Sequence, residues 1–468
     1  MNRRQFLTSS ASILAGAGIL PLASARNAFA QTGTSAQRLA IPPILDTRAT
    51  GRLALQAQPG RTSFGDGPAV VTAGFNQSYL GPTIVMQNGE LATEVTNAIA
   101  EPVSTHWHGL LAPGSHDGGP HQPIDPGATW RPPLNIAQDP ATLWYHSHIH
   151  ERTAEQVYFG LAGVIHVTDG QDDARGLPSG YGVDDLTLVL QDRRFDRAGR
   201  MVYEPSMMDV MHGFLGNRML INGQSGATAV VPEGIVRLRL LNGSNARIYT
   251  LFFDDTRPMH LVATDAGFLP APIAIETLRL APGERAEILV DFSAGPAPVL
   301  MSDPGQAYGV LQFATDGTLP SRITRLPERL DGILEDLIGA EVTTRQVSLD
   351  MGMGGMMMGG GFAINGRPYD MRRIDFEVAL GSVERWHIRS SMVAHPFHVH
   401  GVRFQVVTEN GGPPLPENTG WKDTLLVPGE AEILARFDQP ASAETPFMFH
   451  CHILEHEDAG MMGQFTVT

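Results

Sequence analysis

The chain has 468 residues, including 51 glycines and 34 prolines, and carries a formal net charge of −16 at neutral pH. This acidity argues against nucleic acids and anionic membrane surfaces as partners, because both would repel the chain. At roughly 150 residues per domain, the length predicts about three domains. The sequence contains one cysteine, Cys451, so an intramolecular disulfide is excluded.

Residues 1–30 have the pattern of a cleavable export signal. Arg3 and Arg4 precede a short apolar run at 13–22, and residues 28–30 form a small-x-small cleavage pattern. The paired arginines are typical of the twin-arginine route, which carries folded proteins. The apolar run is too short to span a bilayer, and no later stretch approaches about 18 apolar residues. We therefore expect a protein without membrane insertion, located in a bacterial periplasm or secreted. A monomer is also expected.

The rest of the chain is expected to be all-β. Short runs of alternating apolar and polar residues lie between glycine- and proline-rich turns, as at 236–240, 286–292 and 433–437. In the first of these runs, Val236, Leu238 and Leu240 should share one face of a strand. The continuous apolar run at 186–190 predicts a buried strand.

Two linkers divide this β-rich region. The first, at 171–182, is polar and rich in glycine and proline, and the second, at 319–343, is longer and contains a predicted short helix at 327–338. The expected domains therefore cover 38–170, 181–320 and 344–468.

Histidine is concentrated in four segments, which hold ten of the 17 histidines in the chain. These are His106 and His108; His146 and His148; His395, His398 and His400; and His450, His452 and His456. Because strand side chains alternate, each His-x-His pair places two imidazoles on one face. One such pair is ordinarily two hydrogen-bonded histidines on a half-buried strand, but four pairs indicate metal binding. The pairs occur only in the first and third domains, so the site should form where these domains meet, with the middle domain as a spacer.

The cysteine lies inside the last of these segments. His450 and His452 should point to one side of a strand and Cys451 to the other, so one segment can serve two metal centres. A cysteine, two histidines and a soft thioether, which Met461 would provide, are the ligands of a blue copper site. A lone thiol in an oxidising compartment would be vulnerable to oxidation unless it is buried or bound to a metal.

The order and placement of these motifs resemble those of the three-domain multicopper oxidases, especially bacterial laccase-like enzymes and copper-efflux (cuprous) oxidases. The connectors at 280–287 and 420–424 share the resemblance. It implies three cupredoxin-like Greek-key barrel or sandwich domains and four copper ions. It also implies one-electron oxidation of a substrate at type 1 copper, coupled to reduction of O2 to water at a trinuclear copper cluster.

The resemblance also implies a role for individual residues. The type 1 ligands would be His395, Cys451, His456 and the axial Met461; the type 2 ligands His106 and His398; and the type 3 ligands His108, His146 and His452 on one ion and His148, His400 and His450 on the other. Asp117 and Glu457 would deliver protons to the cluster, or else only orient an imidazole. Some relatives have lost the copper ligands, but this chain retains all of them. The histidines at 116, 121 and 150 are expected to lie at the surface or beside the ligands.

One methionine-rich segment, 350–361, bears on the identity of the substrate. It is predicted to be an exposed loop because it is also rich in glycine. Its thioethers could hold Cu(I), and they belong to Met351, Met353, Met356, Met357 and Met358. Copper-efflux oxidases carry a longer methionine-rich insert in this region, which favours Cu(I) as the substrate. However, the stretch at 390–394 lacks the acid that cuprous oxidases place before the type 1 histidine.

Two alternatives remain open. The first is a laccase-type oxidase of phenols or aromatic amines, in which the methionine-rich loop would be a flap over the type 1 copper. The second is a non-catalytic copper-binding or cell-envelope scaffold protein, as some copper-free relatives are. A nitrite reductase is disfavoured because those chains usually have two such domains and lack the paired His-x-His cluster.

Overall fold

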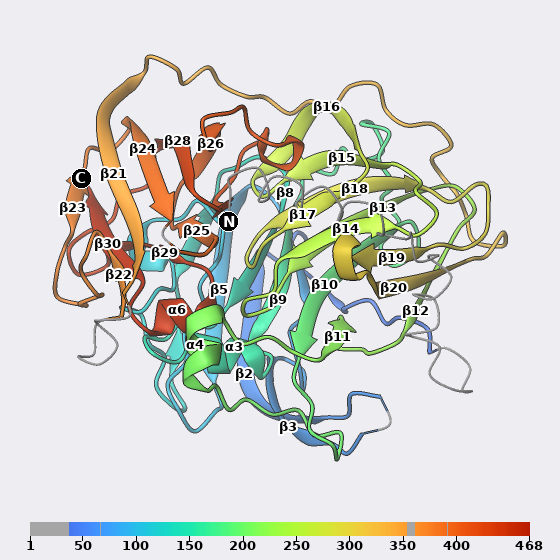
Figure 1. The fold of residues 1–468 in the computed structure, drawn as a ribbon, viewed down its shortest axis with the longest axis horizontal. Coiled ribbons are helices and arrows are strands. Elements are labelled where there is room, and N and C mark those ends of the chain that lie inside the picture. The colour runs from blue at the N-terminus through green and yellow to red at the C-terminus, as the bar shows by residue number, and fades with distance from the viewer. Residues whose placement is uncertain (1–36, 66, 353–360, 391) are drawn as a thin grey trace, which may run out of the picture.

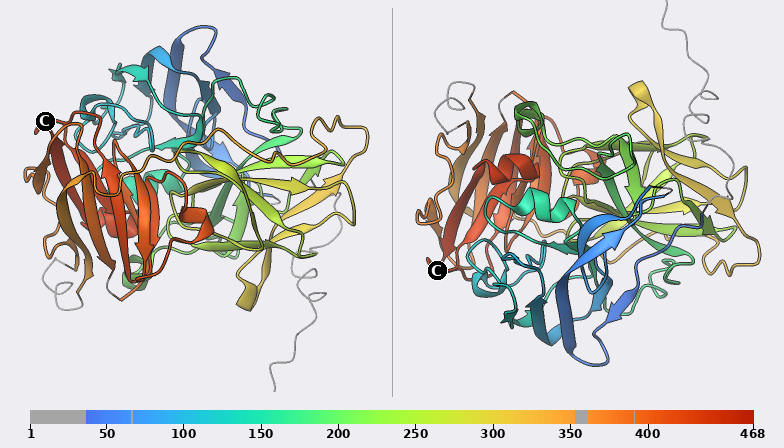
Figure 2. Two further views of the ribbon diagram at one scale, coloured as in Figure 1. Left: turned by 90° about the horizontal axis from the view of Figure 1, so that it is seen from above. Right: turned by 90° about the horizontal axis from the view of Figure 1, so that it is seen from below.

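The computed structural model describes residues 37–65, 67–352, 361–390 and 392–468, and its strands form six β-sheets. The sheets are arranged as three two-sheet domains, which confirms the predicted all-β, cupredoxin-like fold. The first domain (blue to cyan) packs against both the middle domain (green to yellow) and the third domain (orange to red), as Figures 1 and 2 show. No helix in the described ranges is long and apolar enough to cross a membrane.

The first domain joins a sheet of order β1-β4-β9-β8 to one of order β3-β2-β5-β6, with β7 paired to β5. Side chains from both sheets form one core, which includes Leu55, Ile84 and Leu143. The elements are β1 Ile44–Asp46, β2 Arg52–Thr62, β3 Val70–Phe75, β4 Thr83–Met86, β5 Gly89–Asn97, η1 Gly114–His116, β6 Thr129–Trp130, β7 Pro133–Ile136, β8 Ala141–His146, α3 Thr153–Tyr158 and β9 Ala162–Val167.

The middle domain has a six-stranded sheet of order β11-β10-β13-β18-β15-β16 and a five-stranded sheet of order β12-β20-β19-β14-β17. Its elements are β10 Asp185–Arg193, α4 Met207–His212, β11 Arg218–Ile221, β12 Thr228–Val231, β13 Ile235–Asn242, β14 Tyr249–Phe253, β15 Met259–Thr264, β16 Gly267–Ile275, β17 Leu278–Leu280, β18 Arg285–Asp291, β19 Val299–Ser302, η2 Pro304–Gln306 and β20 Tyr308–Thr315.

The third domain has two five-stranded sheets, of orders β22-β21-β24-β28-β26 and β23-β30-β29-β25-β27. Cys451 and Met461 belong to the core between them. The elements are β21 Glu341–Met351, β22 Phe362–Ile364, β23 Phe376–Val378, β24 Val383–Ser390, β25 His395–Val399, β26 Arg403–Glu409, η3 Pro416–Asn418, β27 Thr424–Val427, β28 Glu430–Arg436, β29 Phe447–Cys451, α6 Leu454–Asp458 and β30 Met462–Val467.

Two sequence predictions are wrong. Residues 327–338 form an irregular connection rather than a helix, because neighbouring segments satisfy its backbone: Leu330 donates to the Pro270 carbonyl, and the Trp421 indole donates to the Ile333 carbonyl. Met351 is not part of an exposed loop. It ends strand β21 and is only 8% exposed, because it packs in the core of the third domain. Met353, Met356, Met357 and Met358 lie outside the described residues.

Strand β13 has the predicted alternation, but both of its faces are buried. Val236, Leu238 and Leu240 face the core of the middle domain, as expected. Arg237 and Arg239 on the opposite face are also buried. Arg237 donates to Glu287, and Arg239 donates to Thr142 of the first domain. Burial by itself would raise the pKa of Glu287, but the two guanidinium groups outweigh it and lower that pKa to about 2.

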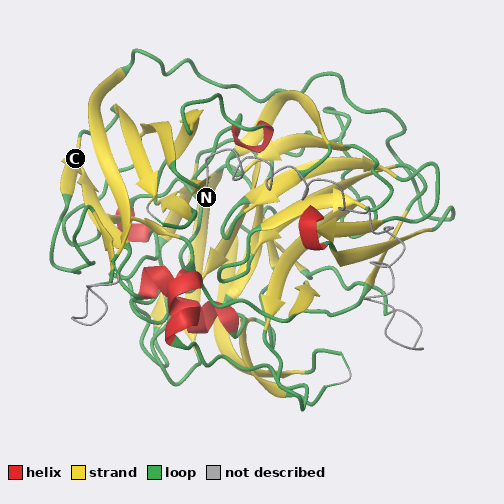
Figure 3. Cartoon of the chain, in the orientation of Figure 1, coloured by secondary structure: helices red, strands yellow, loops and turns green. Residues whose placement is uncertain are grey.

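One short helix from each domain meets the others at a common junction, where α3, α4 and α6 gather (Figure 3). A shared apolar cluster fills this junction and includes Tyr158, Phe214 and Leu454 from the three domains. The junction holds α6, which carries His456, against the middle domain.

Candidate metal centre

Two antiparallel pairings bring the His-x-His segments together. In the first domain, His106 and His146 exchange backbone hydrogen bonds of 2.8 and 3.1 Å. In the third domain, strands β25 and β29 place His398 directly opposite His450. The side chains of these two pairs meet at the boundary between the first and third domains.

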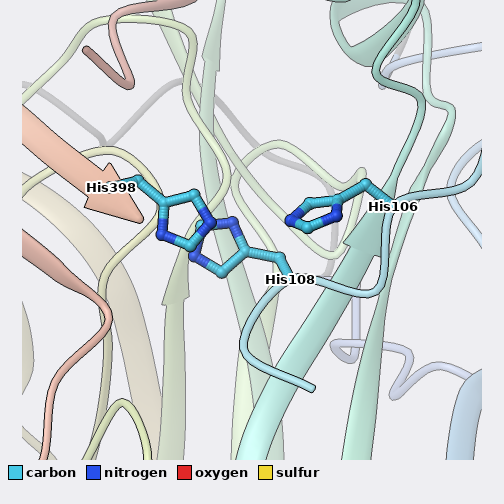
Figure 4. Close-up of side chains that lie close together, drawn as sticks. All are labelled: His106, His108 and His398. Carbon is cyan, nitrogen blue, oxygen red and sulfur yellow. The ribbon is translucent and has the colours of Figure 1, made fainter. Parts of the chain in front are cut away.

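The ring nitrogens form three buried groups at this boundary, each with its ligand atoms within 4.8 Å of one another. The groups are His106, His108 and His398; His108, His146 and His452; and His148, His400 and His450. Figure 4 shows His106 beside His108 and His398, and the rings of His108 and His398 stack with centroids 3.6 Å apart. The structure thus brings together all eight histidines that the sequence assigned to the trinuclear cluster.

Backbone carbonyls determine which ring nitrogen of several histidines is protonated. Nδ1 of four grouped histidines, including His450, lies within hydrogen-bond distance of a backbone carbonyl oxygen. In three of them Nε2 is also left without a partner: Nδ1 of His106 is 3.0 Å from the Asp117 oxygen, Nδ1 of His146 is 2.8 Å from the Ser147 oxygen, and Nδ1 of His398 is 2.8 Å from the Asp423 oxygen. Because a carbonyl oxygen can only accept, each Nδ1 carries the proton and each Nε2 keeps its lone pair. These Nε2 atoms are buried and have no hydrogen-bond partner among the described residues.

Burial also keeps these imidazoles neutral. It lowers the pKa of His108, His146, His148, His398, His400 and His452 well below 6.5, with neighbouring imidazoles adding to the effect. Neutral rings whose lone pairs point into a shared buried space are what a metal ion needs, and burial without a partner is otherwise unfavourable. The residues therefore fit a cluster of copper ions.

The second predicted centre lies in the core of the third domain. The Cys451 sulfur is 3.4 Å from His395 Nδ1 and 3.7 Å from His456 Nδ1, and the two nitrogens are 3.2 Å apart. Cys451 and Met461 are both buried, and the Cys451 N–H donates to the Met461 carbonyl. The Ile453 N–H also donates to the sulfur, at 3.3 Å. One thiolate, two imidazoles and a thioether fit a type 1 copper site.

Metal binding at Cys451 requires the loss of a proton. Burial raises the pKa of its thiol, so the copper-free protein holds this residue as a neutral thiol. The same burial lowers the pKa of His456 to about 3, so that imidazole is already neutral and available at physiological pH.

The two predicted carboxylates both lie beside histidines of the trinuclear groups. Asp117 Oδ2 is 2.7 Å from His400 Nδ1. The Glu457 oxygens are 3.4 Å from His148 Nδ1 and 3.2 Å from His450 Nδ1. Both Glu457 oxygens, and Asp117 Oδ1, are buried without a hydrogen bond in the described part of the chain. Such unpartnered buried oxygens are costly, which favours a role beyond packing.

The histidines at 116, 121 and 150 belong to none of these groups. His116 ends η1, His121 Nε2 is 2.8 Å from Gln464 Oε1, and His150 packs on Tyr369. Two contacts that the middle domain makes with the site could not be predicted from any sequence pattern. The Met211 carbonyl in α4 is 3.3 Å from His456 Nε2, and Arg285 binds Asp423, which touches His108.

The chain is similar to known proteins over its whole length. Three family profiles, each of multicopper oxidases, match residues 56–172, 195–299 and 342–468. The cell division protein FtsP of Escherichia coli strain K12 is 39% identical over 491 residues, covering 100% of this chain and 99% of that protein. The chain belongs to the multicopper oxidase family. This confirms the family that the histidine motifs indicated.

Solved structures of multicopper oxidases are similar over nearly the whole fold. The laccase-like multi-copper oxidase CueO from the lignin-degrading bacterium Ochrobactrum sp. has 44% sequence identity and a TM-score of 0.89, over 92% of this chain and 100% of that one. A laccase from Pediococcus acidilactici has 32% identity and a TM-score of 0.84, over 94% of this chain and 95% of that chain.

The neutral histidines predict that the copper-free protein loses stability as the pH falls. Their pKa values are depressed in the folded state, so the unfolded chain binds more protons below pH 6.5. Each such histidine should therefore lower the free energy of unfolding by up to about 1.4 kcal/mol per pH unit. Burial raises the pKa of Glu455 and Asp458, which offsets part of this slope.

Urea unfolding of the copper-free protein at a series of pH values below neutrality measures the slope. The copper-loaded protein is the comparison, and its stability should fall at least as steeply, because bound copper also keeps the folded histidines unprotonated. A free energy of unfolding that stays constant as the pH falls through 6.5 would contradict the neutral assignment.

Proposed function

We propose that this member of the multicopper oxidase family is an active oxidase that couples the oxidation of Cu(I) to the reduction of O2 to water. The observation that carries the proposal is that all ten predicted histidine ligands and Cys451 are gathered in buried groups, with Cys451 adjacent in sequence to His450 and His452. Bound copper would supply one-electron transfer and four-electron reduction of O2. The chain would supply the path for electrons, the groups that transfer protons and the surface at which the substrate binds.

The path for electrons follows the chain itself. Cys451 belongs to the type 1 group, and its neighbours His450 and His452 belong to the trinuclear groups, so a few covalent bonds connect the two centres. On the outer side, His456 Nε2 lies 3.3 Å from the Met211 carbonyl of α4. Electrons from a substrate would therefore enter across α4 and His456.

Asp117 and Glu457 would hold and transfer the four protons that reduction of O2 consumes. Each carboxylate is within 3.4 Å of the imidazoles of two grouped histidines. One oxygen of Asp117 and both oxygens of Glu457 are buried without a hydrogen bond inside the described chain. These oxygens are therefore available to bind a proton or a water molecule next to the cluster.

Three features support Cu(I) as the substrate. Met207 and Met208 on α4 are 70% and 62% exposed, and they present soft thioether sulfurs beside the path to His456. The chain is acidic, which attracts cations. The segment at 350–361 is rich in methionine. The Ochrobactrum structure, reported with activity towards lignin model compounds and lignosulfonate, favours phenols as the alternative.

A second candidate is a non-catalytic role in the cell envelope during division. The full-length similarity to the cell division protein FtsP supports it. The intact ligand groups favour catalysis. Residues 1–30, which carry the export pattern, lie outside the described residues, and export as a folded monomer to the periplasm is part of this proposal.

Oxygen uptake tests the proposed function. The copper-loaded protein should consume O2 with Cu(I), and uptake with Cu(I), a phenol and Fe(II) should be compared at equal concentrations. Cys451→Ser should lose the intense blue absorption and the uptake, because a hydroxyl does not replace the thiolate as a copper ligand. The fold should persist, since the buried hydroxyl costs only about 1–3 kcal/mol. A wild-type protein that binds copper but consumes no O2 with any of the three reductants would favour the envelope role.

The carboxylates can be tested separately from the copper ligands. In Asp117→Asn and Glu457→Gln, reduction of the blue site by substrate should be nearly unchanged, because both residues lie beside the trinuclear histidines instead. Reoxidation by O2 should slow by roughly a hundredfold or more, the usual loss when a general acid is removed. Stopped-flow measurement of both half-reactions distinguishes the two. Normal copper content with unchanged reoxidation would leave these residues with a structural role only.

The α4 methionines can be tested with isosteric variants. Met207→Leu combined with Met208→Leu keeps the apolar volume but removes both thioethers, so KM for Cu(I) should rise severalfold while oxidation of phenols stays unchanged. Met201→Leu is the control, because Met201 is a buried methionine of the same domain. Unchanged kinetics at low Cu(I) in the double variant would exclude α4 as a docking site for Cu(I).

A further inference from the structure

Asp117 and Asp423 make equivalent contacts on the two sides of the trinuclear site. The Asp117 carbonyl accepts from His106 Nδ1, and its carboxylate lies 2.7 Å from His400 Nδ1. The Asp423 carbonyl accepts from His398 Nδ1, and its carboxylate lies 3.0 Å from a nitrogen of His108. Each aspartate therefore orients one imidazole through its backbone and a second through its side chain.

The contact with His108 differs in one respect. Asp423 Oδ1 is bound to Nε2 of His108, not to Nδ1. Because an ionised carboxylate can only accept, Nε2 carries the proton, and Nδ1 keeps the lone pair and has no hydrogen-bond partner within the described ranges. His108 thus presents Nδ1 to the cluster, whereas His106, His146 and His398 present Nε2.

Arg285 of the middle domain holds the Asp423 carboxylate. Its Nη1 and Nη2 atoms bind Asp423 Oδ1 and Oδ2 at 2.7 and 2.5 Å. The remaining N–H groups donate to the carbonyls of Gly283, Asp265 and Thr142, at 3.0, 2.8 and 3.1 Å. All five guanidinium N–H groups are therefore used, and their partners come from all three domains.

The surrounding backbone leaves space for this pair. A Cβ atom on Gly109, the residue after His108, would lie 2.5 Å from Asp423 Oδ2 and 2.7 Å from Arg285 Nη2, and Gly109 has a φ of +86°. On the middle domain, a Cβ atom on Gly283 would lie 2.9 Å from the His452 ring. The residue after His108 is thus packed against Arg285, and His452 is packed against Gly283; Arg285 and Gly283 both belong to the middle domain.

We propose that Arg285 is a positioning residue of the metal site. Through Asp423 it holds His108 in the tautomer and orientation that direct Nδ1 to the trinuclear cluster, so the middle domain helps to build a site to which it contributes no ligand. This inference rests on the proposed function, because it concerns the geometry of the copper cluster. It adds a requirement that all three domains be docked before the cluster can bind copper completely.

The test compares two buried arginines of the middle domain. Arg285→Lys keeps the charge but has only three N–H donors and cannot bind the carboxylate and three carbonyls together. Arg237→Lys is the matched control, because Arg237 is equally buried but pairs with Glu287. Glu287 accepts hydrogen bonds from Thr142 and Arg239 and contacts none of the grouped histidines in these bonds. Copper content, the type 2 EPR signal and the blue absorption are measured for both variants and for the wild type.

We expect Arg285→Lys to retain the blue absorption, to bind less copper per chain and to show an altered type 2 EPR signal. Arg237→Lys should keep the wild-type values in all three measurements. If Arg285→Lys folds and has wild-type copper content and an unchanged EPR signal, the proposal is overturned. If it does not fold, Asp423→Asn replaces it, since the amide keeps the shape but lacks the charge that binds Arg285; the same two outcomes then decide.

A second measurement needs no copper. Side-chain nitrogen NMR of the copper-free wild type should show His108 protonated at Nε2, and Arg285→Lys or Asp423→Asn should shift the population towards the Nδ1–H form. A wild-type His108 protonated at Nδ1 would refute the proposal even if the protein is an active oxidase. Conversely, an Nε2–H signal in a protein that consumes no O2 would refute the proposed function alone.

Discussion

The site depends on buried imidazoles whose orientation is fixed by hydrogen bonds on the side away from the cluster. Backbone carbonyls bind Nδ1 of His106, His146 and His398, and the carboxylate of Asp423 binds Nε2 of His108. Each of these bonds fixes one proton and so directs the other nitrogen's lone pair inward. Several buried lone pairs facing one another are unfavourable without a cation, so the surrounding structure must hold them in place.

The three-domain architecture provides that support. The first and third domains each contribute one pair of adjacent His-x-His segments, and the boundary between them is where the lone pairs meet. The middle domain contacts both centres from outside. Arg285 binds Asp423 beside the trinuclear groups, while α4 covers the edge of His456 at the type 1 group. Movement of the middle domain would therefore disturb both centres.

The contrast between Asp117 and Asp423 follows from the same arrangement. Both aspartates orient two histidines, but only Asp423 is neutralised by an arginine. Asp117 keeps a buried oxygen without a hydrogen bond in the part of the chain that the structure describes. The two carboxylates thus differ because Arg285 of the middle domain binds one of them, which suits Asp423 to holding His108 in position.

Local features of the site could be predicted from the sequence. Alternation along a strand is a property of neighbouring residues, so the opposite directions of Cys451 and its flanking histidines, and the apolar face of β13, followed directly from the order of residues. The histidine motifs also identified the family, and with it the fold and the grouping of the ligands. These features depend on geometry that spans only a few residues or on motifs that are rare by chance.

Only the tertiary structure decided the features that depend on distant partners. His108 and Asp423 are 315 positions apart, and no local pattern shows that they meet or which ring nitrogen their bond occupies. Residues 327–338 have a helical pattern but form no helix, because other segments satisfy their backbone. Arg237 and Arg239 alternate like a solvent-exposed face but are buried at a domain interface. In each case the sequence determined the chemical groups, and the docking of the domains determined their partners, because hydrogen bonds and ion pairs depend on proximity in space.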